Sequence, residues 1–156
     1  MLRWLWLSVA VIAADQLTKE LATAYLQLDE RVPVMPLLNM TLKHNPGAAF
    51  SLLADSGGWQ RWLFVGLALA VSAFIVAWLK RLRPGQTSLA VALALVLGGA
   101  LGNVWDRVVL GYVVDFIDVY YGTWHWPAFN VADSGIVVGV ALIILDGLFA
   151  ERREKA

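Results

Sequence analysis

The sequence contains no cysteine, which excludes disulfide bonds, a thiolate nucleophile and zinc sites built on cysteine ligands. It is also poor in charge, because only 15% of its 156 residues are Asp, Glu, Lys or Arg, and the 12 basic and 12 acidic residues cancel. A chain without net charge has no strongly basic surface of the kind that nucleic acid binding requires. Any chemistry must therefore come from other side chains, and we expect no nucleic acid partner.

Apolar residues are abundant instead. They make up 60% of the chain, and the mean hydropathy of +0.67 is too high for a soluble domain of this size. A helix needs about 20 apolar residues to cross about 30 Å of hydrocarbon. Four tracts meet or nearly meet this requirement, at residues 4–28, 62–79, 89–105 and 131–150.

These tracts predict an all-α membrane protein with four transmembrane helices in a single integral membrane domain over residues 1–156. Arg3 and the apolar run that follows it also fit a cleavable signal peptide, with small residues at Ala13 and Ala14. The apolar character resumes at Leu21, however, so the first tract is long enough to span a membrane.

Seven basic residues gather on one side of the predicted topology. They are Arg3, Lys80, Arg81, Arg83, Arg152, Arg153 and Lys155. Because Lys and Arg are enriched in cytoplasmic loops, both termini are expected in the cytoplasm, with outer segments at 29–58 and 106–130. The eight tryptophans all fall near the ends of predicted spans, as expected for rings that favour the membrane interface.

The two outer segments carry strand patterns. Residues 38–43 alternate apolar and polar side chains, and residues 112–121 are rich in Val, Ile, Tyr and Phe. Turn-forming residues bound both segments, including Gly111 and Gly122. We therefore expect a small extracytoplasmic β-sheet, formed by the connections between spans 1 and 2 and between spans 3 and 4, that covers the helices.

Ionisable residues inside spans are costly, and they usually face the interior of a bundle or a water-filled cavity. Here they are few, and four of them lie toward the outer half: Asp15, Lys19, Asp106 and Asp133. Asp146 lies near the inner end of the fourth span. The predicted topology brings the outer end of span 3 and the start of span 4 to the same level of the membrane.

Two Asn-x-x-Asp patterns sharpen this expectation, at residues 103–106 and 130–133. A step of three residues holds an amide and a carboxylate on one helical face. Asp115, in the second outer segment, can fold back to this level. Paired carboxylates hydrolyse a peptide when one is ionised and the other protonated, and the amides of Asn103 and Asn130 can fix their orientation.

Structural interpretations compete with a catalytic one for several of these residues. Asn130 is a natural helix N-cap with Asp133 at the third helical position. Asp15 is placed to neutralise Lys19, and Asp106 to pair with Arg107. Asp118 is expected at a solvent-exposed strand position, and Asp146 near the inner surface. We expect no catalytic role for His44 or His125.

The motifs resemble those of the lipoprotein signal peptidases, also called signal peptidase II, across nearly the whole chain. They are Asp-Gln-Leu-Thr-Lys at 15–19, Asn-Pro-Gly-Ala-Ala-Phe-Ser at 45–51, Gly-Gly-Ala-Leu-Gly-Asn-Val-Trp-Asp-Arg at 98–107 with Gly111 and Val-Val-Asp-Phe at 113–116, and Trp-Pro-Ala-Phe-Asn-Val-Ala-Asp at 126–133. Four motifs in the right order on a chain of the right length make this a specific resemblance.

The resemblance implies an aspartic endopeptidase of the bacterial cytoplasmic membrane. Such an enzyme cleaves a diacylglyceryl-modified prolipoprotein just before the lipid-modified cysteine, at the outer face of the membrane. The catalytic residues would be Asp115 and Asp133, with no metal ion or other cofactor, and the protein would act as a monomer among membrane lipids. The residues implied to bind substrate or support the pair are Asp15, Asn45, Asn103, Asp106, Arg107 and Asn130.

Two other functions remain open from the residues alone. A metal-dependent lipid transferase would use Asp106, Asp115 and Asp133 as oxygen ligands. A proton-coupled transporter would also place aspartates in spans, but it would distribute them across the membrane thickness, whereas here they gather toward one face. A serine protease is disfavoured, because the chain has no Gly-x-Ser-x-Gly pattern and no histidine within a span.

Overall fold

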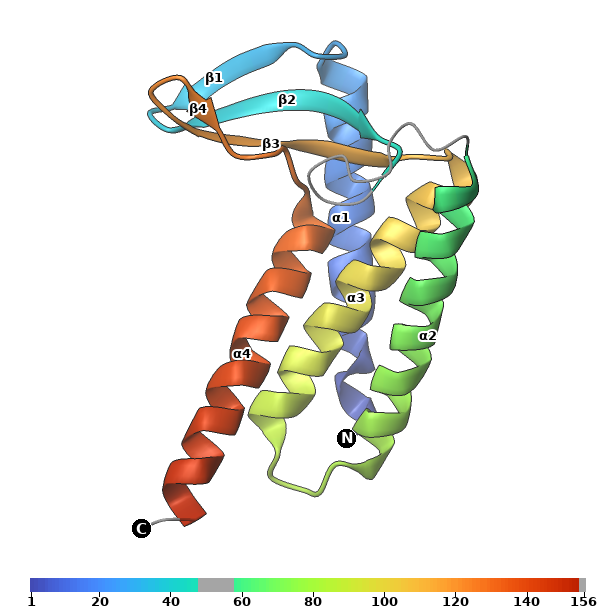
Figure 1. The fold of residues 1–156 in the computed structure, drawn as a ribbon, viewed down its shortest axis with the longest axis vertical. Helices are drawn as coiled ribbons and strands as arrows, with labels where there is room; N and C mark the ends of the chain where they lie inside the picture. Colours follow the sequence, from blue (N-terminus) through green and yellow to red (C-terminus); the bar gives the residue numbers. More distant parts are fainter. Residues whose placement is uncertain (48–57, 155–156) are drawn as a thin grey trace.

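The computed structural model describes residues 1–47 and 58–154. Within these residues, four long helices stand side by side beneath a small β-sheet, and both termini lie at the end of the helices away from the sheet (Figure 1). The elements follow in the order η1 (Leu2–Trp4), α1 (Leu5–Tyr25), β1 (Arg31–Met35), β2 (Leu38–Asn45), α2 (Trp59–Arg81), α3 (Thr87–Val109), β3 (Val113–Tyr121), β4 (Trp124–His125) and α4 (Val131–Glu154). The architecture is mostly helical with a small antiparallel sheet, as the sequence predicts.

Each predicted span coincides with a helix, although the ends differ. The first helix stops at Tyr25, because Leu26 adopts an extended backbone. The third continues to Val109, so Asp106 and Arg107 lie in its last turns and not in the outer segment to which the sequence assigned them. Among the described residues, three helices are long and apolar enough to cross a membrane: Trp59–Arg81, Thr87–Val109 and Val131–Leu148.

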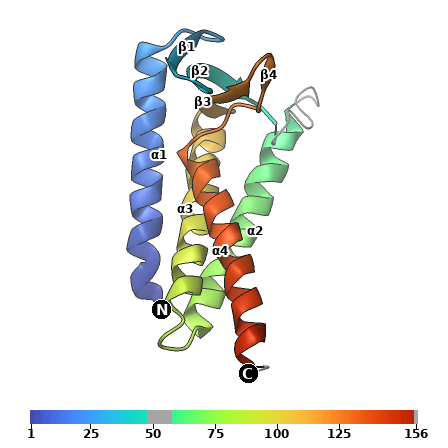
Figure 2. The ribbon, with the colours of Figure 1, turned by 90° about the vertical axis from the view of Figure 1, so that its left-hand side faces the viewer.

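Helix α3 is the centre of the bundle and packs against α1, α2 and α4 (Figure 2). Glycines allow this close approach, as small residues commonly do between membrane helices. A Cβ atom on Gly99 would lie 2.2 Å from the carbonyl oxygen of Ala132 in α4, and one on Gly102 would lie 2.8 Å from the Asp15 Oδ2 atom of α1. Larger residues at these positions would push apart the helices that carry the polar site.

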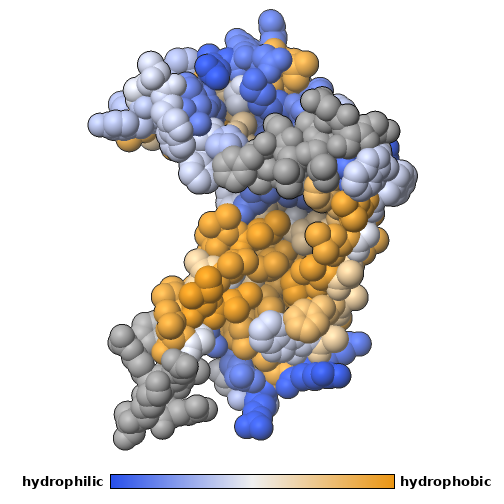
Figure 3. Space-filling model, in the orientation of Figure 1, coloured by the Kyte–Doolittle hydropathy of each residue, from blue (hydrophilic) through white to orange (hydrophobic). Residues whose placement is uncertain are grey.

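The outward faces of the helices are largely apolar. Figure 3 shows this surface as a hydrophobic band between more hydrophilic ends. Exposed side chains of the band include Leu67 and Phe74 of α2 and Val137 and Ile144 of α4. An apolar exterior of this kind suits a hydrocarbon environment, in which backbone polar groups must be satisfied within helices.

The sheet is antiparallel with the strand order β1-β2-β3-β4. The predicted pairing of residues 38–43 with residues 112–121 is confirmed, because β2 pairs with β3 from Leu38 opposite Val119 to Asn45 opposite Val113. A register shift between Met40 and Lys43 places Lys43 opposite Asp115. The sheet therefore brings β3 and its aspartate to the end of the helix bundle.

Candidate active site

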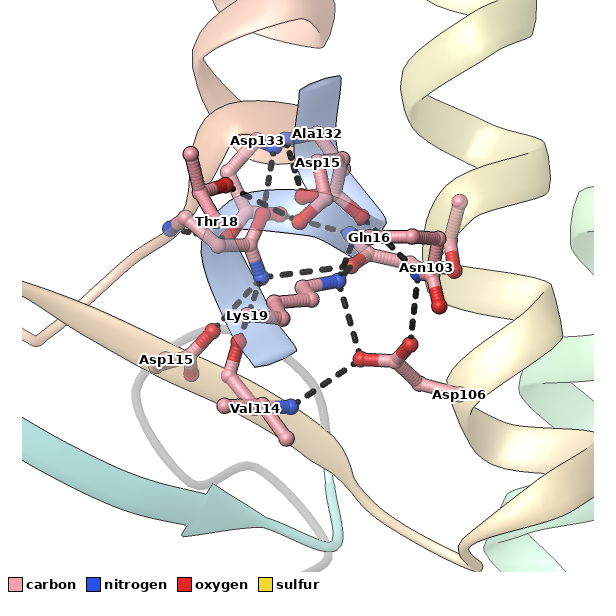
Figure 4. Close-up of polar contacts among 12 residues, drawn as sticks. Asp15, Gln16, Thr18, Lys19, Asn103, Asp106, Val114, Asp115, Ala132 and Asp133 are labelled. Atoms are coloured by element: carbon pink, nitrogen blue, oxygen red, sulfur yellow. Dashed lines mark hydrogen bonds and ion pairs between the residues drawn. The ribbon is translucent and has the colours of Figure 1, made fainter. Parts of the chain in front are cut away.

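Asp115 of β3 and Asp133 of α4 lie on one large cavity of about 930 Å³. Asp115 is buried, and Asp133 is half-buried in the first turn of its helix. Asn130 joins them, because its Nδ2 donates to Asp115 Oδ1 at 2.7 Å and its Oδ1 accepts the Asp133 backbone N–H at 2.9 Å. The two carboxylates come from distant parts of the chain, β3 and the start of α4 (Figure 4), and both line the cavity.

The predicted N-cap at Asn130 is present and contributes to the same arrangement. The Asn130 side chain accepts from the backbone of Asp133, and the Asp133 Oδ2 atom accepts from the Asn130 backbone N–H at 3.4 Å. This reciprocal pattern is a capping box, which satisfies backbone donors at the start of α4. Capping and site geometry are thus compatible interpretations of the same motif, because the cap fixes Asp133 at the cavity wall.

Amide side chains hold both carboxylates, as the sequence predicts for Asn103 and Asn130. The Asn103 Nδ2 donates to Asp133 Oδ1 at 2.8 Å, while its Oδ1 accepts from Lys19 Nζ at 3.1 Å and from Asn130 Nδ2 at 3.2 Å. Because the ammonium of Lys19 can only donate, it sets which end of the Asn103 amide faces Asp133. Asn45 adds a second donor to Asp115, from its Nδ2 to Oδ2 at 3.1 Å.

The ammonium of Lys19 is the centre of a second, fully buried polar cluster. It lies 2.7 Å from Asp15 Oδ2 and 2.9 Å from Asp106 Oδ2, and its bond to Asn103 is the third. The predicted pairing of Asp15 with Lys19 is confirmed, but the predicted pairing of Asp106 with Arg107 is wrong. Asp106 is turned toward Lys19 and also accepts from the Gln16 Nε2 at 2.8 Å.

This cluster also forms hydrogen bonds with the backbones of β3 and α4. The Asp106 Oδ2 atom accepts the backbone N–H of Val114, next to Asp115, at 3.1 Å. The Asp15 Oδ1 atom accepts the backbone N–H of Ala132, next to Asp133, at 2.8 Å. Asp15 and Asp106 therefore position the backbones that carry the two cavity carboxylates.

Lys19 and Gln16 were not among the predicted site residues. The spacing of Asp15 and Lys19 along one helix indicates that pair, but the other partners come from α3, and no signal within α1 identifies them. Figure 4 shows Lys19 between the carboxylates of Asp15 and Asp106.

Arg107 lines the large cavity, but no described carboxylate forms an ion pair with it. Its Nη2 donates to the carbonyl oxygen of Gly47 at 2.8 Å, and its guanidinium lies 5.4 Å from the ring centroid of Phe64. Arg107 thus holds the chain just after Asn45 beside the cavity. The remainder of the motif that begins at Asn45, residues 48–51, lies outside the described residues.

The electrostatics distinguish Asp115 from an ordinary surface aspartate. Burial raises the pKa of Asp115 to about 7, and the charge of Asp133 adds to this shift. Hydrogen bonds from Asn45 and Asn130 and the charge of Lys19 act in the opposite direction without cancelling it. Near neutral pH, Asp115 is therefore close to its midpoint of protonation, as an acid-base group should be.

The walls of the large cavity are chemically divided. Its polar part is formed by Asp115, Asp133, Asn45, Asn103 and Arg107, together with Lys43, His44 and Ser134. The rest is mainly apolar, with Ile136, Val137 and Val138 on α4 and the segment 126–129 near the sheet. The cavity can thus receive a molecule with a polar reacting group and an apolar attachment.

Asp118, His125 and Asp146, for which the sequence suggested no catalytic role, do not line the large cavity. The interpretation of Asp118 as solvent-exposed is wrong, because it is 4% exposed and accepts from the Asn39 Nδ2 at 2.9 Å. The His125 Nδ1 atom lies 2.8 Å from the same carboxylate. Asp146 follows Asp133 by 13 residues in α4, or about 20 Å along the helix axis, so it lies toward the opposite end.

Among residues 1–47 and 58–154, no group of three or more His, Asp or Glu side chains is arranged to hold a metal ion. Asp106 faces Lys19 and not the two cavity carboxylates. The arrangement of Asp106, Asp115 and Asp133 thus differs from that required by the alternative of a metal-dependent transferase.

Comparisons with known proteins find relatives over almost the whole chain. The model of the family described as signal peptidase (SPase) II matches residues 7–149. A lipoprotein signal peptidase of Pseudomonas aeruginosa (strain UCBPP-PA14) is 57% identical over 99% of this chain and 93% of its own length. One from Acinetobacter baumannii (strain ATCC 17978) is 55% identical over 96% of this chain and 85% of its own.

Solved structures share the fold over almost the whole chain. A bacterial membrane enzyme determined by the in meso method at 2.3 Å resolution has a TM-score of 0.87 and 32% identity, covering 99% of this chain and 92% of its own. A second, determined by the same method at 1.9 Å resolution, has a TM-score of 0.82 and 33% identity over 94% of this chain and 92% of its own. The arrangement of helices and sheet is therefore that of a membrane enzyme.

Proposed function

The chain belongs to the signal peptidase II family, and we propose that it removes the signal peptide from lipid-modified prolipoproteins by aspartic catalysis, with Asp115 and Asp133 as the catalytic pair. One observation carries this proposal. The two carboxylates line one cavity, and the Asn130 side chain contacts both residues, the carboxylate of Asp115 and the backbone N–H of Asp133, with no described cation paired to either carboxylate.

The chemistry needs the pair to hold one proton. The ionised carboxylate takes a proton from a water molecule, whose oxygen adds to the carbonyl carbon before the cysteine, while the protonated carboxyl donates to the carbonyl oxygen. The C–N bond then breaks as the carboxyl that took the proton of water donates it to the amine of the lipid-modified cysteine, while the other carboxylate takes a proton back from the tetrahedral intermediate, whose carbon becomes the new carboxyl group. Because the two groups titrate as a unit, the proton belongs to the pair and not permanently to either residue.

The apolar part of the large cavity supports a lipid-modified substrate. A diacylglyceryl group remains in the bilayer, since each buried CH₂ contributes about 0.8 kcal/mol. The side chains of Ile136, Val137 and Val138 extend the cavity along α4 from the turn that carries Asp133. The acyl chains would lie against this wall while the peptide bond reaches the aspartates.

The supporting residues divide into two roles. Asn45, Asn103 and Asn130 donate to the catalytic carboxylates and keep their oxygens oriented. Asp15 and Asp106 act through the backbone N–H groups of Ala132 and Val114. Arg107 also lines the cavity and would hold a substrate carbonyl.

The topology that fits this function has four spans in one integral domain, in which α1 crosses the membrane in addition to α2, α3 and α4. Helix α1 has 21 residues, a length of about 31 Å, and its buried ion pair of Asp15 and Lys19 reduces the cost of charge within the membrane. Both termini would be cytoplasmic, on the side of Lys80 and Arg81, and the sheet with the catalytic pair would lie at the outer face of the bacterial inner membrane. We expect a monomer.

Purified protein in detergent, incubated with a lipidated and a non-lipidated form of one precursor, tests the proposal. Cleavage before the cysteine of the lipidated form alone is expected, and it should survive EDTA because no step uses a metal ion. Cleavage of both forms at equal rates would contradict the lipid requirement. Activity that EDTA abolishes and a divalent cation restores would favour metal-dependent chemistry instead.

A further inference from the structure

A second, smaller cavity of about 240 Å³ lies on the sheet, and we call it the sheet cavity. Its polar lining comes from four strands: Arg31 of β1, Thr41 and Lys43 of β2, Asp118 of β3 and His125 of β4. None of these residues is used in the chemistry proposed above. Figure 1 shows these strands at the end of the molecule opposite the two termini.

The sheet cavity is lined by the carboxylate of Asp118, which already has hydrogen-bond partners within the sheet. Burial by itself raises the pKa of Asp118, but hydrogen bonds from Asn39 and His125 outweigh it, and the pKa lies below its ordinary value. Asp118 is therefore ionised at neutral pH, with its oxygens directed to partners within the sheet. It offers little acceptor capacity to a ligand.

The rim of the sheet cavity is basic. The Arg31 side chain is 54% exposed, and its single ion pair among the described residues runs from Nε to Asp118 at 3.7 Å. The Lys43 ammonium pairs with Asp29, whose side chain is 67% exposed. The pair of Lys43 with Asp29 is exposed and therefore weak, and the contact of Arg31 with the buried Asp118 is long, so both cations can turn toward an anionic ligand.

The sheet cavity adjoins the catalytic one. Four residues line both: Lys43, Trp126, Pro127 and Ala128. Lys43 is the cross-strand neighbour of Asp115, and Asp118 follows Asp115 by three residues along β3, a separation of about 10 Å. A peptide in extended conformation covers that distance with about three residues.

We propose that the sheet cavity binds an acidic side chain of the substrate, within the second to fourth residue counted from the lipid-modified cysteine as the first. This inference rests on the proposed function. The lipid anchor and the signal peptide remain in the membrane, so the chain that follows the cysteine must leave toward the sheet, where this cavity provides two cations beside the reacting groups. An acidic residue there would improve binding before and during cleavage.

The test compares lipidated precursors that differ at one position. Asp, Asn or Lys is placed at the second, third or fourth residue, and kcat/KM is measured for each. We expect Asp to exceed Asn, and Asn to exceed Lys, by about two- to fivefold per step at one or more of these positions. Arg31→Glu should reverse this order, and Arg83→Glu, which changes a cation outside both cavities, should leave it unchanged.

The outcomes separate the two proposals. An enzyme that cleaves the lipidated precursor with no dependence on these residues, or an order that Arg31→Glu does not alter, would overturn the sheet cavity as a subsite and leave the proposed function intact. Failure of the wild-type protein to cleave any precursor would overturn the proposed function itself. If kcat/KM instead follows the fraction of anionic lipid in vesicles, and Arg31→Glu removes that dependence, the cavity binds a lipid headgroup and the peptide subsite is wrong.

Discussion

Two pairs of aspartates lie near the same end of the bundle in different surroundings. Asp15 and Asp106 flank the ammonium of Lys19, which contacts them at 2.7 and 2.9 Å. Asp115 and Asp133 receive side-chain amide donors instead, and among the described residues no cation pairs with them. The first pair is closed within the protein, whereas the second lines a cavity.

This difference is the reason for proposing a structural role for one pair and a catalytic role for the other. Asp15 and Asp106 are each held in a buried ion pair with the ammonium of Lys19. Carboxylates that approach each other without a cation must share a proton, which supplies an acid and a base together. Charge compensation thus supports the proposal that Asp15 and Asp106 are structural supports and that Asp115 and Asp133 are the reacting groups.

The largest effect is expected when the reacting pair is changed. Asp115→Asn and Asp133→Asn each remove one member of the acid-base pair while keeping the size of the side chain, so cleavage should fall about a thousandfold or more. Cleavage assays with the lipidated precursor, together with thermal unfolding in detergent, measure activity and folding separately. Full activity in either folded variant would remove that residue from the chemistry.

Changing Lys19 should affect stability first. Lys19→Met leaves Asp15 and Asp106 buried without their cation, which should destabilise the protein by about 3–5 kcal/mol. Lys80→Met, at the opposite end of the bundle, is the matched control and should have little effect. If Lys19→Met unfolds at the wild-type temperature, the compensated cluster does not support the fold as described here.

The pH dependence of stability gives a smaller but directional test. Because the folded-state pKa of Asp115 is about 7, well above about 3.9 in an unfolded chain, the folded protein binds more protons between these values. Its stability should therefore fall as pH rises from about 4 to 7 and then level off. Asp115→Asn should weaken this slope in thermal unfolding measured across the same range, and an unchanged slope would contradict the assignment.

The smallest effect is expected far from both pairs. Asp146 lies toward the opposite end of α4, so Asp146→Asn should retain activity within about twofold. The same cleavage assay checks this variant beside the Asp133→Asn variant of the same helix. A well-folded Asp146→Asn protein without activity would mean that the reacting groups are not confined to the sheet end.

The helices, the paired strands and the placement of Asp115 and Asp133 near the same end of the bundle were predictable because each leaves a local or topological signal. Long apolar tracts fix the helices, alternation fixes β2, and the order of spans brings the start of α4 to the end of α3. The capping box at Asn130 is also local, since its partners are three residues apart. These features follow from neighbours along the chain.

The errors concern contacts between elements. Asp106 pairs with Lys19 and not with Arg107, because α3 packs closely on α1 at Gly102 and turns that carboxylate inward. Asp118 is buried because β2 and β4 cover it with Asn39 and His125. Neither partner can be identified from spacing within one strand or helix, so side-chain pairing across elements required the structure.

The most direct test of the difference between the two pairs is a titration of Asp115 followed by infrared spectroscopy of its carboxyl group, with Asp115→Asn used to assign the signal. In the wild-type protein the group should titrate near pH 7. In Asp133→Asn its pKa should fall, because the neighbouring negative charge is gone while the amide donors remain. An identical titration in wild type and Asp133→Asn would show that the two carboxylates do not act as one pair, and the central claim would be wrong.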